Sequence, residues 1–238
     1  MSGLQAVVLA AGLGTRLGRP LPKPLTELRD GRSILAQQVD NLRYELGPDL
    51  PITVVVGFKA YLVMEAAPDL LFAYNEAYDS TNTSKSLLRA LGVSHPGGVL
   101  WMNGDVVFDP RILELVRPQL DADESFVCVN TETVAEEEVK YTVDDAGYVR
   151  ELSKTVVGGL GEAVGINYVS SADKAVLVEE LAACAPNDYF ERGMETAIAR
   201  RGLRFRPIDI SRYSAVEVDF EEDLVRADSS LGGGALRP

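Results

Sequence analysis

The amino-acid sequence predicts an α/β fold of the Rossmann-like kind, with three α/β/α layers around a mostly parallel mixed sheet. Short apolar runs rich in β-branched residues alternate with segments of helical periodicity, which is the pattern of strand–helix–strand units. The chain has 238 residues, of which 46% are hydrophobic and 25% charged, so it can bury a substantial core. The sequence contains neither an internal repeat nor a linker. We therefore expect one domain over residues 1–228 and a flexible C-terminal tail over residues 229–238.

The first half of the chain predicts parallel strands joined by helices. Its first helix can begin at Ser33, a residue type that caps helices, and Gly47-Pro48 ends it after Leu46. Asp109-Pro110 is a good cap and first turn for a later helix that reaches Val116. The predicted strands are 6–10, 52–56, 71–74, 99–102 and 126–129, and the other predicted helices are 61–67 and 84–91.

The second half of the chain predicts a change to mixed strand pairing. Two β-rich runs, 140–143 and 148–152, flank Asp144-Asp145-Ala146-Gly147, which is typical of a hairpin turn. We expect this β-hairpin to form a small lobe beside the sheet. Further strands are expected at 165–169, 203–208 and 216–219, and helices at 172–183 and 188–201.

Charge and cysteine content exclude several classes of protein. Lys and Arg number 23 and Asp and Glu 36, which gives a net charge of −13, so a nucleic-acid backbone would be repelled over most of the surface. Cys128 and Cys184 lie in separate apolar runs, which indicates neither a disulfide framework nor a thiolate metal site. The first apolar stretch ends at Ala11 and is too short for a membrane helix or a signal-peptide core. We expect a cytoplasmic protein that binds neither nucleic acid nor a membrane.

A glycine-rich segment after the first strand has the composition of a phosphate site. It reads Leu9-Ala10-Ala11-Gly12-Leu13-Gly14-Thr15-Arg16 and is followed by Pro22-Lys23-Pro24. Small residues let backbone N–H groups approach an anion, and Arg16 and Lys23 would add charged contacts to phosphate oxygens. Leu17 stands where a dinucleotide fingerprint needs glycine, and the chain lacks the Gly-Lys-Ser/Thr ending of a P-loop. The alternative is an ordinary turn between a strand and a helix.

Acidic residues at the ends of two apolar strands would complete a site for a triphosphate and Mg²⁺. Asp105 follows the run 99–102, and Asp219 follows a later run together with Glu217. In an open α/β sheet the carboxyl ends of the strands face the ligand crevice, where the glycine-rich segment also emerges. Mg²⁺ prefers such hard oxygen ligands and keeps several waters. A turn aspartate at Asp105 and a helix N-cap at Asp219 are the structural alternatives.

These segments resemble the nucleotidyltransferase superfamily that makes sugar-nucleotides and related activated esters. That family opens with G-x-G-[S/T]-R followed by P-K-x-[L/M], which residues 12–16 and 22–25 match. The resemblance implies that Asn103-Gly104-Asp105 is a second station, where the aspartate binds Mg²⁺. It also implies that Glu217-Val218-Asp219 is a third station, where acidic residues complete the metal site.

Within that superfamily the chain is most similar to the small cytidylyltransferases of the phosphocholine type. The similarity rests on residues 75–87, where Asn75 and Tyr78 are followed by Asn82 and by Ser86-Leu87. The resemblance, and not the composition, implies cytosine as the base. Together with the glycine-rich segment it implies nucleotide contacts from Leu9, Ala10, Ala11, Gly12, Gly14, Thr15, Asn82, Ser84, Ser86, Asn103 and Gly104.

The resemblance also implies an acceptor site at the hairpin lobe. Lys154 stands where the family often places a lysine that holds the acceptor phosphate, and a surface lysine is the alternative. Residues 162–165 are similar to the family's Gly-Glu-x-x-Gly element, so Glu162 would face a cationic group of the acceptor. Tyr189 would add an aromatic face, which suits a quaternary ammonium.

The expected reaction transfers CMP from CTP to a small phosphate or phosphonate acceptor, with Mg²⁺ as cofactor and release of pyrophosphate. The acceptor oxygen would attack the α-phosphorus in line, while Lys23 stabilises charge at the α-phosphate and Arg16 holds the departing phosphates. Asp105, Asp219 and Glu217 would bind the metal. Two alternatives stay open: a sugar-1-phosphate nucleotidyltransferase that uses UTP, GTP or dTTP, and a nucleotide-binding module without catalysis. A homodimer is compatible with the sequence.

Overall fold

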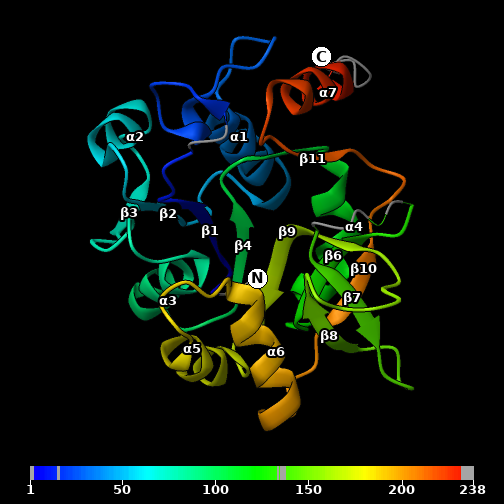
Figure 1. Ribbon diagram of the computed structural model, residues 1–238. Coiled ribbons are helices and arrows are strands. Elements are labelled where there is room, and N and C mark those ends of the chain that lie inside the picture. Colours follow the sequence, from blue (N-terminus) through cyan, green and yellow to red (C-terminus); the bar gives the residue numbers. More distant parts are fainter. Residues whose placement is uncertain (1–2, 15–16, 133, 135–137, 232–238) are drawn as a thin grey trace.

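The central sheet follows the strand order β10-β6-β9-β4-β1-β2-β3 in the computed structural model, which describes all residues except 1–2, 15–16, 133, 135–137 and 232–238 (Figure 1). β1 (Gln5–Ala10) lies in the middle and pairs in parallel with β2 (Ile52–Val56) on one side and β4 (Val99–Asn103) on the other. β3 (Leu71–Tyr74) continues the parallel half beyond β2. Every residue of β1 is buried, as expected for a central strand covered on both faces.

Antiparallel pairing enters the sheet at β9 (Glu162–Val169), which lies between β4 and β6 (Phe126–Asn130). β10 (Arg206–Asp209) forms a parallel pair with β6 at the edge. β7 (Lys140–Val143) and β8 (Val149–Ser153) form a hairpin that joins the sheet through β9. The predicted fold class, a mostly parallel mixed sheet with a β-hairpin lobe, is confirmed.

One face of the sheet packs against α1 (Ile34–Leu46) and α4 (Arg111–Asp121) (Figure 1). Their apolar residues form one core cluster with Ala6, Val8 and Ala10 of β1. Ser33 accepts a hydrogen bond from the Ala36 N–H at 3.1 Å and caps α1, as the sequence predicts.

The opposite face of the sheet packs against α3 (Thr83–Val93), α5 (Lys174–Ala183) and α6 (Phe190–Arg201) (Figure 1). Val7 and Leu9 of β1 enter this second core. Because side chains alternate along a strand, β1 contributes to both cores and lies between two layers of helices. These are the three layers that the sequence predicts.

Three smaller elements lie around the sheet: the short 3₁₀-helix η2 (Lys23–Leu25), α2 (Ala60–Ala66) and α7 (Glu221–Leu231). α7 packs through Leu224 and Ala227 in a third apolar cluster, which also contains Leu28, Val107 and Val218. α7 therefore continues three residues into the predicted C-terminal tail, and residues 232–238 lie outside the described part of the chain.

A second, two-stranded sheet is a feature that the sequence analysis missed. β5 (Val106–Phe108) begins directly after Asp105 and pairs antiparallel with β11 (Ala215–Glu217). Glu217 lies opposite Val106 in this pairing. The pairing of β5 with β11 therefore brings Asp105 and Glu217 close together, although they are far apart in the sequence. Apolar β5 is only three residues long, so its pattern alone does not separate it from a loop.

Several element boundaries differ from the predicted ones. α4 continues past Val116 to Asp121, through Pro118, because Leu120 is buried and anchors the last turn. α6 begins at Phe190 and not at Asp188, whose side chain accepts a hydrogen bond from a loop N–H at 2.8 Å. None of the helices described, with these bounds, has the length and apolar composition needed to span a bilayer.

The carboxyl-terminal end of the predicted strand 216–219 also differs from the prediction. β11 ends at Glu217, and the N–H groups of Asp219 and Phe220 donate to Asp223 Oδ2 at 2.9 and 2.7 Å. Asp223 lies in the first turn of α7, so it fixes the chain between β11 and that helix. Asp219 therefore belongs to a short connection and not to a strand.

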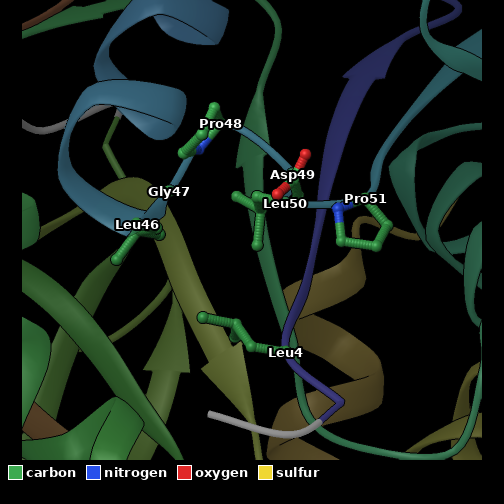
Figure 2. A pocket seen from close by; sticks show the side chains of 7 residues that line it. All are labelled: Leu4, Leu46, Gly47, Pro48, Asp49, Leu50 and Pro51. Carbon is green, nitrogen blue, oxygen red and sulfur yellow. The ribbon is translucent and has the colours of Figure 1, made fainter.

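A shallow cavity of about 300 Å³ opens beside the amino ends of β1 and β2 (Figure 2). It is lined by Leu4, which precedes β1, and by residues 46–51, which connect α1 to β2. Asp49 is the only ionisable residue in this lining. Leu9, Ala10 and Gly12, which the sequence analysis selected, lie at the other, carboxyl end of β1.

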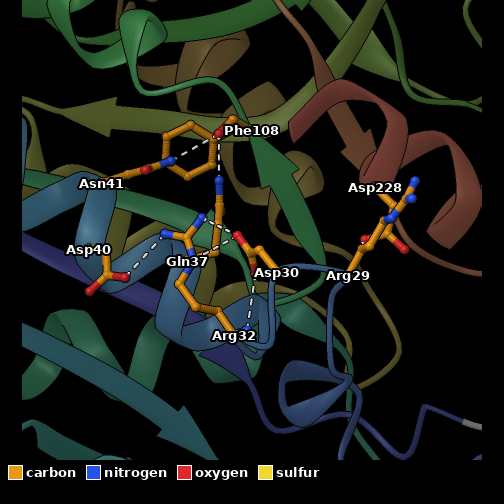
Figure 3. Close-up of polar contacts among 8 residues, drawn as sticks. All are labelled: Arg29, Asp30, Arg32, Gln37, Asp40, Asn41, Phe108 and Asp228. Carbon is orange, nitrogen blue, oxygen red and sulfur yellow. Dashed lines mark hydrogen bonds and ion pairs between the residues drawn. The ribbon is translucent and has the colours of Figure 1, made fainter. Parts of the chain in front are cut away.

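Buried amides of α1 hold the chain that leads away from the Asp105 turn (Figure 3). Gln37 Nε2 and Asn41 Nδ2 both donate to the carbonyl of Phe108, at 2.7 and 2.9 Å. In the segment before α1, the Arg29 N–H donates to Asp228 of α7 at 2.8 Å. α1 and its preceding segment thus contact both β5 and α7, the elements that follow the acidic residues of the site.

Candidate active site

A cleft of about 700 Å³ opens at the carboxyl ends of β1 and β4, the edge of the sheet where open α/β folds bind ligands. Its wall joins segments that are far apart in the sequence. The predicted site residues found in this wall are Leu9, Ala10, Gly12, Gly14, Lys23, Asn82, Asn103, Gly104, Asp105, Lys154, Tyr189, Glu217 and Asp219. The structure therefore brings Gly12 and Gly14, both lysines and the three predicted metal-binding acids around one space.

Glycines let two backbone segments touch in this cleft. The Gly104 N–H donates to the carbonyl of Leu9 at 2.9 Å, and a Cβ at Gly104 would lie only 2.7 Å from the same oxygen. Gly14 has φ +60°, a conformation that favours glycine, and a Cβ there would lie 3.2 Å from Cβ of Lys23. These contacts place the end of β1, the β4–β5 turn and Lys23 against one another.

Two of the three acidic residues, Asp105 and Asp219, contact the Lys23 ammonium. Lys23 Nζ donates to Asp105 Oδ2 at 2.6 Å and to Asp219 Oδ1 at 2.5 Å, and only 11% of its side chain is exposed. Burial alone would lower the pKa of Lys23, but the attraction and hydrogen bonds of both aspartates outweigh burial and raise that pKa above 10.5. Lys23 is therefore an ammonium throughout the physiological range.

The same acidic residues fit a divalent cation. Asp105, Glu217 and Asp219 each offer an oxygen atom, and the three oxygens lie within 4.8 Å of one another. Asp105 Oδ1 is buried and has no hydrogen-bond partner among the described residues, which an ion would satisfy. Loss of water around the carboxyl, and then repulsion from Asp105 and Asp219, raise the pKa of Glu217. Carboxylate oxygens in this arrangement suit Mg²⁺, a hard cation.

Gln38, which the sequence analysis did not select, holds the turn that carries Asp105. The Gln38 side chain is buried, and its Nε2 donates to the carbonyls of Asn103 and Val106, both at 2.8 Å. On the other side, the Val218 N–H donates to the Asp105 carbonyl at 2.9 Å. The turn is therefore fixed from α1 and from the chain between Glu217 and Asp219.

The wall of the cleft also carries a lysine, an aromatic ring and a buried carboxyl group. Lys154 Nζ lies 5.3 Å from the centroid of the Tyr189 ring. Glu191, in the first turn of α6, also lines the cleft although it is only 8% exposed. Its Oε2 has no hydrogen-bond partner within the described part of the chain. Burial raises the pKa of Glu191 to about 7, and a hydrogen bond from its own backbone N–H and then the charge of Lys154 oppose this change.

Gln38 and Glu191 share a sequence signal. Gln38 lies one helical turn from the buried Leu35 and Leu42, and Glu191 lies one turn before the buried Met194. Each is thus a polar residue within the apolar stripe of a predicted helix. A buried polar group needs a partner or a function, so such interruptions mark candidate site residues.

Four of the predicted contact residues lie outside the cleft wall, namely Ala11, Ser84, Ser86 and Glu162. The helical phase of α3 turns both serines into the core: Ser84 is fully buried, and Ser86 Oγ accepts from Asn75 Nδ2 at 3.1 Å. Glu162 pairs with Asn130 in the register of β9 and β6. The contact of these side chains with nucleotide or acceptor stays a prediction, and Glu191 is an acidic side chain that does line the cleft.

Asn82 lines the cleft, and its side chain caps α3 by accepting from the Thr83 N–H at 2.8 Å. Thr15 and Arg16 lie outside the described residues, so their assignment stays a prediction from the sequence.

Comparison with known proteins gives matches along most of the chain. The family model described as MobA-like NTP transferase domain matches residues 6–201. The CMP-5'-(3-aminopropyl)phosphonate synthase of Streptomyces rubellomurinus is 29% identical over an alignment of 262 positions. This alignment covers 94% of the chain and 38% of the synthase, so the chain spans well under half of that relative's length.

Two solved structures share the fold over nearly the whole chain. The CTP:phosphocholine cytidylyltransferase of Streptococcus pneumoniae has a TM-score of 0.73 at 19% identity, covering 96% of this chain and 99% of that one. The inositol-1-phosphate CTP transferase of T. maritima has a TM-score of 0.78 at 16% identity, with 98% of both chains covered. At these identities the similarity establishes a common architecture.

Proposed function

The chain belongs to the family of MobA-like NTP transferase domains, and from this premise we propose that it transfers CMP from CTP to a small phosphonate or phosphate acceptor that carries an amine. Pyrophosphate is the second product. The similarity to a CMP-aminopropylphosphonate synthase supports the choice of nucleotide and of acceptor.

The observation that carries this proposal is the distribution of charge along the cleft. One group of charges is Lys23 with Asp105 and Asp219, which form a carboxylate cluster with Glu217. The other group is Lys154, beside Tyr189, with the buried carboxyl group of Glu191. The first group suits a triphosphate with a divalent cation, and the second suits a small molecule that bears both a phosphonate and an ammonium.

The glycine-rich segment and Lys23 act on the nucleotide. Backbone N–H groups near Gly12 and Gly14 hold the phosphates, since the lack of side chains lets an anion approach. Lys23 stabilises the negative charge that grows at the α-phosphate as the acceptor oxygen attacks in line. Arg16 is assigned to the departing β- and γ-phosphates by the sequence alone.

Asp105, Asp219 and Glu217 would hold Mg²⁺, which would neutralise part of the triphosphate charge when bound. The other groups align the two substrates. The phosphonate oxygen forms the new bond to the α-phosphorus, the bond from that phosphorus to the β-phosphate oxygen breaks, and pyrophosphate leaves. A phosphonate is ionised near neutral pH, so the reaction needs no general base and depends on alignment and charge neutralisation.

The acceptor end accounts for the two charges of an aminophosphonate. Lys154 contacts the phosphonate, and the Glu191 carboxylate accepts a hydrogen bond from the ammonium. Tyr189 offers an aromatic face beside them, which favours a cation. A carboxyl group that is nearly buried without a hydrogen-bond partner at Oε2 gains such a partner when the ammonium binds.

Pyrophosphate release with each nucleotide and each acceptor tests the proposal. The enzyme is incubated with CTP, UTP, GTP or dTTP, and with 3-aminopropylphosphonate, phosphocholine or glucose 1-phosphate. We expect the highest kcat/KM with CTP and the aminophosphonate, a coupled product by mass spectrometry, and no metal-dependent turnover from the Asp105→Asn variant. Preference for glucose 1-phosphate with UTP, GTP or dTTP would establish the sugar-1-phosphate alternative. Nucleotide binding without any turnover would establish a non-catalytic module.

A further inference from the structure

The Lys23 ammonium lies where a metal ion shared by Asp105 and Asp219 would have to lie. It contacts Asp105 Oδ2 at 2.6 Å and Asp219 Oδ1 at 2.5 Å. Mg²⁺ needs its oxygen ligands at about 2.1 Å, so a metal and the ammonium cannot both lie between the same two oxygens. A dication bound elsewhere in the cluster would still be repelled by an ammonium within a few ångströms.

Lys23, Asp105 and Asp219 are largely enclosed, which makes this competition strong. The side chain of Lys23 is 11% exposed, and those of Asp105 and Asp219 are 19% and 25% exposed. Charges in such a place are poorly screened by water and salt. A metal that displaced Lys23 into solvent would break both of its contacts with carboxylates. The ammonium would gain no anionic partner in return, so this displacement is unfavourable.

The phosphate site offers Lys23 a second partner close by. Gly14 of the glycine-rich segment packs against Lys23, since a Cβ at Gly14 would lie 3.2 Å from Cβ of the lysine. Both residues line the same cleft as the carboxylates. A flexible lysine side chain can thus exchange a carboxylate for a phosphate oxygen by a change of rotamer, without movement of the backbone.

We propose that Lys23 occupies the metal site of the nucleotide-free protein and moves onto the triphosphate when the nucleotide binds, which makes metal binding depend on nucleotide binding. This inference rests on the proposed function only in taking a nucleoside triphosphate as the anion. The dependence is reciprocal, so the metal strengthens nucleotide binding by the same factor by which the nucleotide strengthens metal binding. Free metal alone binds weakly because it has to displace an ammonium that then has no anionic partner.

Direct Mn²⁺ binding tests the inference, with free Mn²⁺ measured by its EPR signal in the absence of nucleotide. We expect weak binding to the wild type and at least about tenfold tighter binding to Lys23→Met, which keeps the length of the side chain but removes the charge. Lys23→Arg keeps a cation between the carboxylates and should bind Mn²⁺ as weakly as the wild type. Lys59→Met is the matched control, because the Lys59 ammonium bonds to the Pro20 carbonyl and not to the carboxylates.

A second measurement gives the coupling. The affinity for CTP is measured by calorimetry in the presence of EDTA and in the presence of Mn²⁺. The ratio of the affinity with Mn²⁺ to the affinity with EDTA should be much larger for the wild type than for Lys23→Met. Folding of each variant is checked by thermal unfolding, and Lys23→Gln replaces Lys23→Met if that variant does not fold. Equal Mn²⁺ affinity of the wild type and the folded neutral variants would overturn the inference.

Failure of the proposed function gives a different result from failure of this inference. A gain of Mn²⁺ binding in Lys23→Met requires neither CTP specificity nor an acceptor. If the gain is observed with a protein that does not couple CTP to any acceptor, the ammonium is the occupant of the metal site and only the proposed reaction is wrong. If turnover with CTP is found but the gain is absent, the reaction stands and the exchange of Lys23 does not.

Discussion

Individual residues of the cleft show two opposite ways of keeping a charged group away from water. Lys23 is buried with two carboxylate partners, which hold it as an ammonium. Glu191 is buried with one oxygen unpaired, and burial raises its pKa to about 7. An unpaired buried carboxyl group is unfavourable in the free protein. Its position in the cleft is explained if a ligand supplies the missing cation.

Replacement of Glu191 by glutamine tests this role at the level of one side chain. We expect Glu191→Gln to raise KM for 3-aminopropylphosphonate by about 10- to 100-fold at pH 8, the effect of one charge-assisted hydrogen bond, with little change in kcat. KM for propylphosphonate, which lacks the amine, should not change. Glu195→Gln on the same helix is the control, since Glu195 pairs with Arg192. An equal rise of KM for both acceptors would show that Glu191 does not read the amine.

Acidic pH should mimic this substitution in the wild type. A pKa of about 7 means that Glu191 accepts a proton as the pH falls from 8 to 6, so its attraction for an ammonium is lost. KM for 3-aminopropylphosphonate should therefore rise over this range more steeply than KM for propylphosphonate. The second acceptor corrects for the titration of the phosphonate itself. The extra slope should be absent in Glu191→Gln.

At the level of secondary structure elements, α1 positions the Asp105 turn through buried amides. Gln38 bonds to the two carbonyls that flank Gly104 and Asp105, whereas Gln37 bonds farther along β5, to Phe108. Both amides are buried and both anchor α1 to the same short strand. Only the contacts of Gln38 reach the residues next to a predicted metal ligand.

Comparison of Gln38→Leu with Gln37→Leu separates this positioning effect from stability. Each substitution leaves buried carbonyl oxygens with fewer partners and should lower the free energy of unfolding by about 1–3 kcal/mol. We expect Gln38→Leu alone to raise the Mg²⁺ concentration needed for half-maximal activity, by about tenfold, because the Asp105 turn loses its support. Urea unfolding gives the stability, and a Mg²⁺ titration of the rate gives the second quantity. The same Mg²⁺ requirement in both variants would mean that Gln38 is only structural.

For the whole molecule, a site that contains buried charge lowers stability in a way that depends on pH. The pKa of Glu191 is about 7 in the folded chain, above the ordinary value of 4.5. Between these two values the folded state holds a proton that the unfolded state has released. The contribution of this group therefore becomes less favourable as the pH rises from 4.5 to 7, and stays so above it.

The free energy of unfolding of Glu191→Gln should then exceed that of the wild type at pH 8. The difference is at most about 3 kcal/mol, from the shift of the pKa, and should vanish towards pH 4.5. Urea denaturation at a series of pH values measures it for the variant, the wild type and Glu195→Gln. A variant that is no more stable than the wild type at pH 8 would show that Glu191 has a compensating partner.

The sequence by itself determined the layered α/β architecture, the place of the glycine-rich segment and the candidate acids at strand ends. The strand 52–56 and the start of the first helix at Ser33 were predicted correctly because they depend on the order of neighbouring residues. The hairpin around Asp144 was predicted for the same reason, since a turn is specified by a few adjacent residues.

Only the tertiary structure decided which polar groups meet. The pairing of β5 with β11 brings Glu217 to Asp105, and no local pattern specifies a contact between strands that are more than a hundred residues apart. The same holds for Lys23 between Asp105 and Asp219 and for Gln38 beneath the β4–β5 turn. Glu191 lines the cleft because the phase of α6, fixed by core packing, turns it there, whereas Glu162 pairs with Asn130 in the register of β9 and β6. Packing between distant segments sets these side-chain directions, and periodicity along the chain does not.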